Sequence, residues 1–322
     1  MFLSSFPFQP QLRKFGIIVA LFMGLASCER GQQSAIHEQG LSPIPEKLEE
    51  SKSISGKNAL FHANQIAGIG DRSPGSPGAQ LQRAYLTKVL TRYGWVVSEQ
   101  AFDADTPEGT WKLVNLRAKF GGVPGKESAQ GIVSCHIDTK TGIPKFTGAN
   151  DGASGAALIL ELARILQQRP KLAKDIELVF FDGEESAGLH MTEEDGLYGS
   201  TYYADKMMEP YPSWLINLDM VGRQGMKIRV PADTNQRMYE LYNQAIKALN
   251  FNSASWGVSS GMIMDDHVPF MKKGIPCLNI IDDFRDGSWW HTANDSVEIL
   301  DADSFLQSGK MTLYLIERLT NK

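Results

Sequence analysis

Four short, predominantly apolar runs constrain the fold of this chain most strongly. They comprise residues 132–137, 176–181, 215–220 and 277–281. Continuous apolar runs of this length are typical of strands that are buried on both faces. Helical periodicity lies before, between and after them, at residues 59–66, 79–93, 152–166, 235–249 and 301–319. This alternation predicts an α/β fold in which helices flank a mostly parallel central sheet.

Size and composition are those of an ordinary globular protein. The chain has 322 residues, of which 42% are hydrophobic and 21% are charged. We expect residues 57–322 to form a single globular domain, which is large enough to bury a substantial core. The formal net charge of −5 provides no basic surface for nucleic acid, so we expect no such partner. The sequence does not indicate an oligomeric state.

The amino terminus has the form of an export signal. Arg13 and Lys14 precede an apolar run at residues 15–25, which is too short to span a bilayer. The run ends in Leu25-Ala26-Ser27-Cys28, which resembles the bacterial lipobox, where the chain is cut before the cysteine and the cysteine is lipidated. An ordinary signal peptide that happens to contain a cysteine is the alternative. We predict a lipoprotein signal peptide at residues 1–27, and an exported protein held by a lipid on Cys28 at a bacterial membrane, with its domain in the periplasm or at the cell surface.

Residues 28–56 are rich in Gln, Ser, Glu and Lys and contain few large apolar side chains. This composition predicts a flexible tether between the lipid and the domain. The two other cysteines, Cys135 and Cys277, lie in the apolar runs. They are either paired in an oxidising compartment or buried as free thiols, and the sequence leaves both possibilities open.

Polar residues follow the predicted strands at the point where each strand ends. They are His136, Asp138, Asp182, Glu184, Glu185 and Asp219, together with Asp151 at the start of a helix and His291 in the loop after the last strand. Ligands bind beyond the carboxyl ends of parallel strands, so we expect these side chains to converge. Imidazole nitrogens and carboxylate oxygens are suitable ligands for Zn²⁺. Any one of these residues alone is adequately explained as a cap or a loop residue, but together they predict a zinc site.

The adjacent pair Glu184 and Glu185 is informative by itself. Two neighbouring carboxylates repel each other, and burial raises the pKa of at least one. A cation relieves this cost for one carboxylate and leaves the other available as a general acid and base. A solvated acidic turn is the alternative, but the apolar run directly before the pair argues against it.

The order of these residues resembles the zinc aminopeptidase clan. The clan pattern reads here as His136-x-Asp138, Asp151, Glu184-Glu185, Asp219 and His291. The resemblance implies a mixed sheet flanked by helices. One branch of the clan contains two-metal aminopeptidases, and the other contains glutaminyl-peptide cyclotransferases with one zinc ion.

The surrounding segments resemble the glutaminyl-peptide cyclotransferases. The matching segments are RSPGSPG at 72–78, FDGEE at 181–185, DGLYGS at 195–200, DDHVPF at 265–270 and WHT at 290–292. This resemblance implies that the chain is an acyltransferase that closes the amino-terminal glutamine of peptides and proteins to pyroglutamate and releases ammonia.

The resemblance also implies roles for single residues. Asp151, Glu185 and His291 would hold one zinc ion per chain, and Glu184 would shuttle protons during catalysis.

Two further acidic residues and a pocket complete the site that the resemblance implies. Asp219 and Asp265 would be the hydrogen-bonded acidic partners of the proton shuttle. Trp290, His136 and Phe284 would line the substrate pocket, with His136 near the metal but not bound to it. The loop lengths around Phe284 depart from the family pattern, so the aromatic lining is its least defined part.

A non-enzymatic lipoprotein that binds peptides is one alternative, but a mere metal-binding module would not need Glu184 beside Glu185. The stronger alternative is a two-zinc aminopeptidase that hydrolyses amino-terminal residues. In that enzyme, His136 and Asp219 would bind the second zinc ion. The ligand pattern alone is compatible with either metal count.

Overall fold

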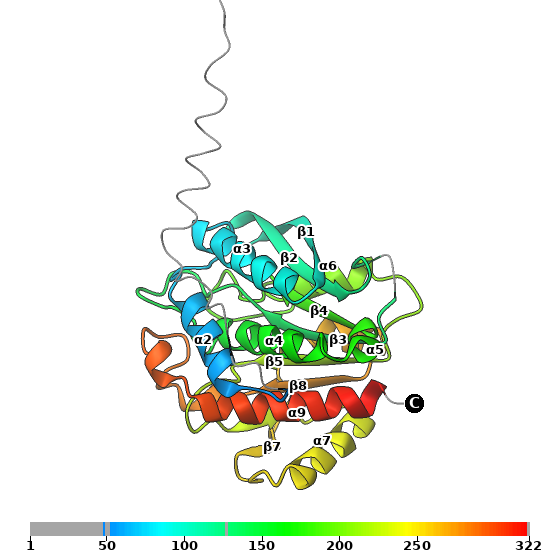
Figure 1. Ribbon diagram of the computed structural model, residues 1–322. Helices are drawn as coiled ribbons and strands as arrows, with labels where there is room; N and C mark the ends of the chain where they lie inside the picture. The colour runs from blue at the N-terminus through cyan, green and yellow to red at the C-terminus, as the bar shows by residue number, and fades with distance from the viewer. Residues whose placement is uncertain (1–47, 49–51, 126–127, 321–322) are drawn as a thin grey trace, which may run out of the picture. The chain divides into compact units, whose positions relative to one another are not determined.

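The centre of the computed structural model is a six-stranded sheet with helices on both faces (Figure 1). The structure describes residue 48, residues 52–125 and residues 128–320. The predicted signal peptide, Cys28 and most of the predicted tether lie outside the described residues.

The helices and strands follow one another along the chain in a largely alternating order. They are α2 (Gly56–Ala67), α3 (Pro77–Arg92), β1 (Trp95–Thr106), β2 (Gly109–Phe120), β3 (Gly131–His136), α4 (Ala153–Leu166), α5 (Pro170–Lys174), β4 (Ile176–Phe181), α6 (Tyr198–Lys206), β5 (Trp214–Asp219), β6 (Ile228–Val230), α7 (Gln236–Ala248), β7 (Trp256–Val258), α8 (Val268–Lys272), β8 (Cys277–Ile281) and α9 (Ala302–Thr320). Two 3-10 turns, Phe284–Asp286 and Val297–Ile299, precede α9.

The strand order is β1-β2-β4-β3-β5-β8. The pairs β4 with β3, β3 with β5 and β5 with β8 are parallel, whereas β1 with β2 and β2 with β4 are antiparallel. The sheet is therefore mixed and mostly parallel, which confirms the predicted fold class. Strands β6 and β7 form a separate two-stranded sheet.

Both faces of the parallel strands are packed. Alternate residues of β3 point to opposite faces, so that Val133 joins a core with α2, α4 and α9, while Ile132 joins a second core with α6 and α8. This double burial explains why these strands read as continuous apolar runs. Cys135 and Cys277 are buried in different cores as free thiols, so they do not pair.

A close approach of helix α4 to the sheet brings the start of that helix to the sheet edge. A Cβ atom on Gly155 would lie 2.4 Å from the carbonyl oxygen of Leu218 in β5 and 2.7 Å from the Cys135 Cβ. Only glycine fits at this crossing. Asp151, just before α4, is thereby placed beside the ends of β3 and β5.

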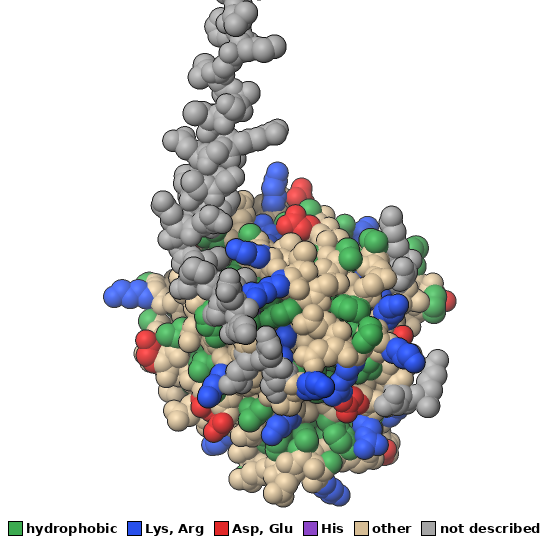
Figure 2. Space-filling view, viewed as in Figure 1, with side chains coloured by type: hydrophobic (Ala, Val, Ile, Leu, Met, Phe, Trp, Pro, Cys, Tyr) green, Lys and Arg blue, Asp and Glu red, His purple; other side chains and the backbone are tan. Residues whose placement is uncertain are grey.

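On the face shown in Figure 2, basic, acidic and apolar side chains are interspersed. Within the described residues, none of the helices is both long enough and apolar enough to cross a membrane.

Candidate metal centre and active site

The carboxyl ends of three parallel strands bring the predicted site residues together. His136 is the last residue of β3, and Asp219 is the last residue of β5. Glu184 and Glu185 follow β4 after a turn at Gly183, whose φ of 75° favours glycine. All four side chains are buried. The convergence follows directly from the parallel arrangement, because such strands end at the same edge of the sheet.

The Asp151 carboxylate contacts two histidines. Its Oδ1 lies 3.0 Å from His136 Nε2, and its Oδ2 lies 3.4 Å from His291 Nε2. His291 Nε2 is also 3.0 Å from Glu185 Oε1, and His136 Nε2 is 3.2 Å from Asp219 Oδ1. Asp151 therefore joins two clusters, each with one histidine and one further carboxylate.

Each cluster has the donor set of a metal site. The ligand atoms of Asp151, Glu185 and His291 lie within 4.8 Å of one another, and so do those of His136, Asp151 and Asp219. Asp151 Oδ2 is buried without a hydrogen bond. A buried carboxylate oxygen without a hydrogen bond is costly, and a cation would remove that cost. The residues present therefore fit a zinc ion, by donor type as well as by convergence.

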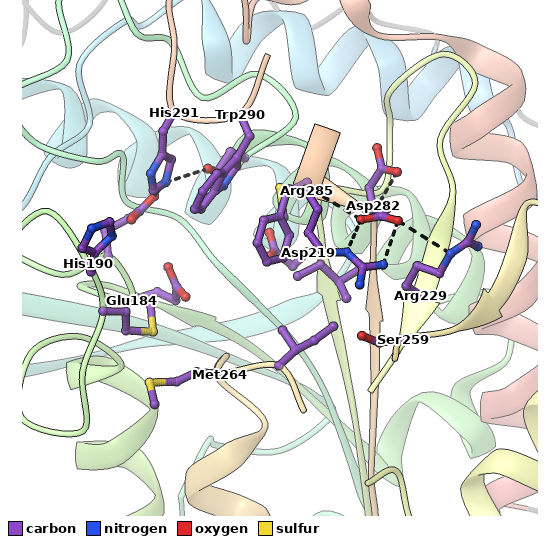
Figure 3. A pocket seen from close by; sticks show the side chains of 18 of the residues that line it. Glu184, His190, Asp219, Arg229, Ser259, Met264, Asp282, Arg285, Trp290 and His291 are labelled. Atoms are coloured by element: carbon purple, nitrogen blue, oxygen red, sulfur yellow. Dashed lines mark hydrogen bonds and ion pairs between the residues drawn. The ribbon is translucent and has the colours of Figure 1, made fainter. Parts of the chain in front are cut away.

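His291 adopts a backbone conformation that is rare for its residue type. Its φ is 52°, and Met220, directly after Asp219, has the same value. Left-handed residues other than glycine are uncommon and gather at functional sites. The Trp290 ring stacks on the His291 imidazole with centroids 3.8 Å apart, and Figure 3 shows the two side by side. Stacking on Trp290 and the contacts with Asp151 and Glu185 hold the His291 ring in place despite this strain.

Asp138, the second member of the His-x-Asp motif, orients the pair of glutamates. Its two carboxylate oxygens accept hydrogen bonds from the backbone N–H groups of Glu184 at 3.0 Å and Glu185 at 3.1 Å. Its Oδ1 also lies 3.5 Å from His136 Nδ1. Asp138 therefore links the end of β3 to the start of the loop after β4.

Burial and like charges favour the protonated form of Glu184. Burial raises the pKa of Glu184 well above its ordinary value, and the nearby charges of Glu185 and Asp265 add to this, while His136 opposes it. The Glu184 Oε2 lies 3.9 Å from His136 Nδ1. Burial also raises the pKa of Glu185, whose neighbour Asp151 adds to the shift, whereas His291 lowers it. The two adjacent glutamates thus have different partners.

Asp265 lies in a polar network that crosses three buried strands. Its Oδ1 accepts a hydrogen bond from Asn217 Nδ2 at 3.0 Å, and its Oδ2 accepts one from Asn279 Nδ2 at 2.7 Å. Ser134 Oγ donates to Asn217 Oδ1 at 2.8 Å and so fixes the orientation of that amide. Burial raises the pKa of Asp265 to about 7, and the charge of Asp219 adds to this shift.

Two residues that the sequence did not single out hold the loops of the site. Asp295 accepts hydrogen bonds from the backbone N–H groups of Asn150 at 2.7 Å and Asp151 at 3.0 Å. Lys140 Nζ donates to the carbonyl oxygens of Ser186 at 2.6 Å and Gly188 at 2.8 Å.

A pocket of about 490 Å³ opens onto the donor clusters. Asp151, Glu184, Glu185, Asp219 and His291 all contribute to its lining. Its volume lies in the range typical of small-molecule sites.

The aromatic residues predicted for the pocket are brought together in its wall. Trp290 and Phe284 both line the pocket, and their ring centroids lie 4.7 Å apart. The Phe284 ring therefore lines the pocket even though the loop around it is longer than in the family pattern. His136 differs from the prediction, because it is buried and does not contribute to the lining. As the last residue of a central strand, it contacts Asp151 and Asp219 instead.

Comparison with protein families identifies the class of protein. The model of peptidase family M28 matches residues 116–316. The chain therefore belongs to peptidase family M28.

Similar proteins place the chain more narrowly within this family. It is 30% identical over 291 residues to the glutaminyl-peptide cyclotransferase of Boiga irregularis, covering 77% of this chain and 78% of the relative. The crystal structure of Porphyromonas gingivalis glutaminyl cyclase superposes with a TM-score of 0.75 at 26% identity, covering 83% of this chain and 99% of that one. These matches confirm the predicted resemblance to the glutaminyl-peptide cyclotransferases.

The fold alone is shared more widely. A zinc-dependent exopeptidase from Parabacteroides distasonis superposes with a TM-score of 0.74 at 23% identity, covering 84% of this chain and 99% of that one. The fold thus occurs in proteins with different activities, and the site must be used to separate them.

Proposed function

We propose that this protein closes the amino-terminal glutamine of peptides and proteins to pyroglutamate and releases ammonia. The observation that carries the proposal is that the adjacent residues Glu184 and Glu185 have different positions in the site. Glu185 belongs to the donor cluster with Asp151 and His291, whereas Glu184 lines the same pocket outside that cluster. The similarity to glutaminyl-peptide cyclotransferases supports this assignment.

Asp151, Glu185 and His291 would hold one zinc ion per chain. When bound there, zinc supplies a Lewis acid that polarises the side-chain amide carbonyl of the glutamine. Asp138 and Asp295 position these ligands, because their carboxylates accept hydrogen bonds from the backbone N–H groups of Glu185 and Asp151, respectively. Such outer contacts orient the ligands of a metal site.

Glu184 is the general base and then the general acid of the proposed reaction. It accepts a proton from the α-amine as the amine nitrogen attacks the amide carbon, and it passes the proton to the departing ammonia. The raised pKa of Glu184, caused first by burial, suits a group that must hold a proton in the middle of the cycle. The attack is intramolecular, so that correct orientation of the glutamine supplies much of the rate.

Asp219 and Asp265 would assist Glu184, and the aromatic residues would hold the substrate. Asp265 is fixed by two asparagine amides, and its charge raises the pKa of Glu184. Trp290 and Phe284 form an apolar wall against which the bent glutamine side chain can pack.

A second candidate function is favoured by the second donor cluster. His136, Asp151 and Asp219 would hold a second metal ion, and metal ions held by both clusters would supply an activated water for the hydrolysis of amino-terminal residues. This is the chemistry of a two-metal aminopeptidase.

One experiment separates the two candidates. The protein is incubated with a Gln-initiated peptide and with an otherwise identical Ala-initiated peptide, and the products are weighed. Cyclisation predicts loss of one ammonia from the first peptide and no change in the second. An aminopeptidase would shorten at least one of the peptides.

We further propose that the chain is exported and held at a bacterial membrane by a lipid on Cys28. The support is the lipobox-like segment Leu25-Ala26-Ser27-Cys28 after a short apolar run. Residues 28–56 would then separate the membrane from the enzyme.

A further inference from the structure

Exposed apolar side chains gather at the mouth of the pocket. Leu189, Met262 and Met264 are 82%, 78% and 41% exposed, and all three line this pocket. Single exposed apolar residues are common on protein surfaces, but several around one pocket mark a binding surface. We call these three residues the apolar rim. Met264 is visible beside the pocket in Figure 3.

The rim is presented by anchored segments of the chain. Leu189 follows Gly188, whose N–H donates to Asp195 Oδ2 at 2.8 Å and whose carbonyl accepts from Lys140 Nζ at 2.8 Å. Met264 directly precedes Asp265, whose carboxylate is held by two asparagine amides. The exposure of Leu189 and Met264 is therefore a property of their positions in the folded protein.

We infer that the apolar rim binds the residues that follow the amino-terminal glutamine and favours apolar side chains there. This inference rests on the proposed function, which places the glutamine at the inner end of the pocket beside Glu184 and His291. The rest of the peptide must then leave through the mouth, where the rim lies. The pocket volume of about 490 Å³ leaves room for more than the glutamine alone.

Two cationic side chains that line the pocket are already engaged within the protein. Lys140 Nζ binds Ser186 and Gly188, and the Arg285 guanidinium pairs with Asp283 at 2.7 Å. A charged substrate residue would have to compete with these contacts. Two of the three rim residues are methionines, whose flexible side chains adapt to many apolar shapes. The rim should therefore select apolar character rather than one particular side chain.

The test compares peptides that differ only in the residue after glutamine. We expect kcat/KM of the wild-type full chain to be roughly tenfold higher for Gln-Leu and Gln-Phe peptides than for Gln-Ser and Gln-Asp peptides. In the double variant Leu189→Ser with Met262→Ser, this ratio should fall to about one. Both side chains are largely exposed, so their replacement removes little packing from the fold.

A matched control is available elsewhere on the surface. Met208 is 81% exposed and does not line this pocket. Met208→Ser should therefore keep the wild-type ratio. A wild-type ratio near one, or a double variant that retains the wild-type ratio, would overturn the inference.

Two other outcomes have distinct meanings. If the double mutation weakens sedimentation of the Cys28→Ser protein with phosphatidylcholine vesicles but leaves the peptide ratio unchanged, the rim contacts a membrane and the inference is overturned. Absence of ammonia release from every Gln-initiated peptide would contradict the proposed function itself. Ammonia release without any preference would contradict only the role of the rim.

Discussion

The Oδ1 of Asp151 lies 3.0 Å from Nε2 of His136, while the other oxygen of the same carboxylate faces His291. One carboxylate therefore belongs to both donor clusters of the site. Whether His136 binds a metal ion or only braces Asp151 decides between one zinc ion and two.

Replacement of His136 by alanine tests the metal count. With one zinc ion held by Asp151, Glu185 and His291, His136→Ala should leave about one zinc ion per chain, although activity is expected to fall as Asp151 loses a contact. Elemental analysis of the purified wild type and variant measures this. His190→Ala is the control, because His190 is exposed and belongs to neither cluster. Two zinc ions in the wild type that fall to one in His136→Ala would indicate the two-metal aminopeptidase.

Replacement of Glu184 by glutamine tests the proton shuttle. Glutamine keeps the shape of the side chain but cannot accept a proton, so turnover should fall by roughly 10²-fold or more. Zinc content should be unchanged, because Glu184 lies outside the cluster of Asp151, Glu185 and His291. The exposed Glu193 provides the matched control, and Glu193→Gln should retain wild-type turnover. Loss of zinc from Glu184→Gln would mean that the two adjacent glutamates have exchanged roles.

The burial of His62 in helix α2 leads us to expect that the free energy of unfolding falls in acid. Burial lowers the pKa of His62 to about 3, and the charge of Arg164 adds to this. In the unfolded chain the pKa of this histidine is near 6.5, so below pH ~6.5 the unfolded chain binds a proton that the folded protein excludes. The stability that the folded protein gains from a neutral His62 is therefore complete above pH ~6.5 and is lost as the pH falls towards ~3.

The variant His62→Gln isolates this effect. Glutamine cannot take up the proton but can still hydrogen-bond the Tyr85 hydroxyl, which lies 2.7 Å from His62 Nδ1. Between pH ~7 and ~5, the free energy of unfolding of the wild type should fall by about 2 kcal/mol more than that of the variant. Urea denaturation at the two pH values measures the difference. Equal losses in both proteins would show that His62 is not kept neutral by the fold.

The proposed anchor makes a simple prediction about location. Without the thiol of Cys28, no thioether-linked lipid can form, so Cys28→Ser should move the protein from the membrane fraction into the soluble fraction. Fractionation of cells that express the wild type or the variant measures this. Continued membrane association of Cys28→Ser would contradict the lipid anchor.

The strands of the parallel sheet could be predicted from the sequence to within one residue. Strands β4 and β8 begin and end where their apolar runs do, because each is buried on both faces. The hairpin of β1 and β2 was not predicted. Within strand β1 only Trp95 is buried, and the other positions are half-buried or exposed. Polar residues such as Ser98 and Gln100 stand between apolar ones, so β1 contains no continuous apolar run.

The convergence of the candidate donor residues could also be predicted, because each lies at or after the end of a buried strand or at the start of a helix. The residues that support them could not. Asp295 holds the backbone of Asn150, and Asn217 holds Asp265, across long stretches of chain. Asn217 lies within an apolar run, where nothing in the local sequence distinguishes it from a solvent-facing position. Such roles depend on tertiary contacts that periodicity and spacing do not encode.

Incubation with a Gln-initiated peptide in water labelled with heavy oxygen tests the central claim most directly. Cyclisation joins the α-amine to the side-chain carbonyl without using water, so the product should be lighter by one ammonia and should carry no heavy oxygen. Hydrolysis of the peptide bond or of the side-chain amide would instead introduce an oxygen atom from water. An unlabelled pyroglutamyl peptide is the result that we predict, and a shortened or labelled product would contradict the proposed function.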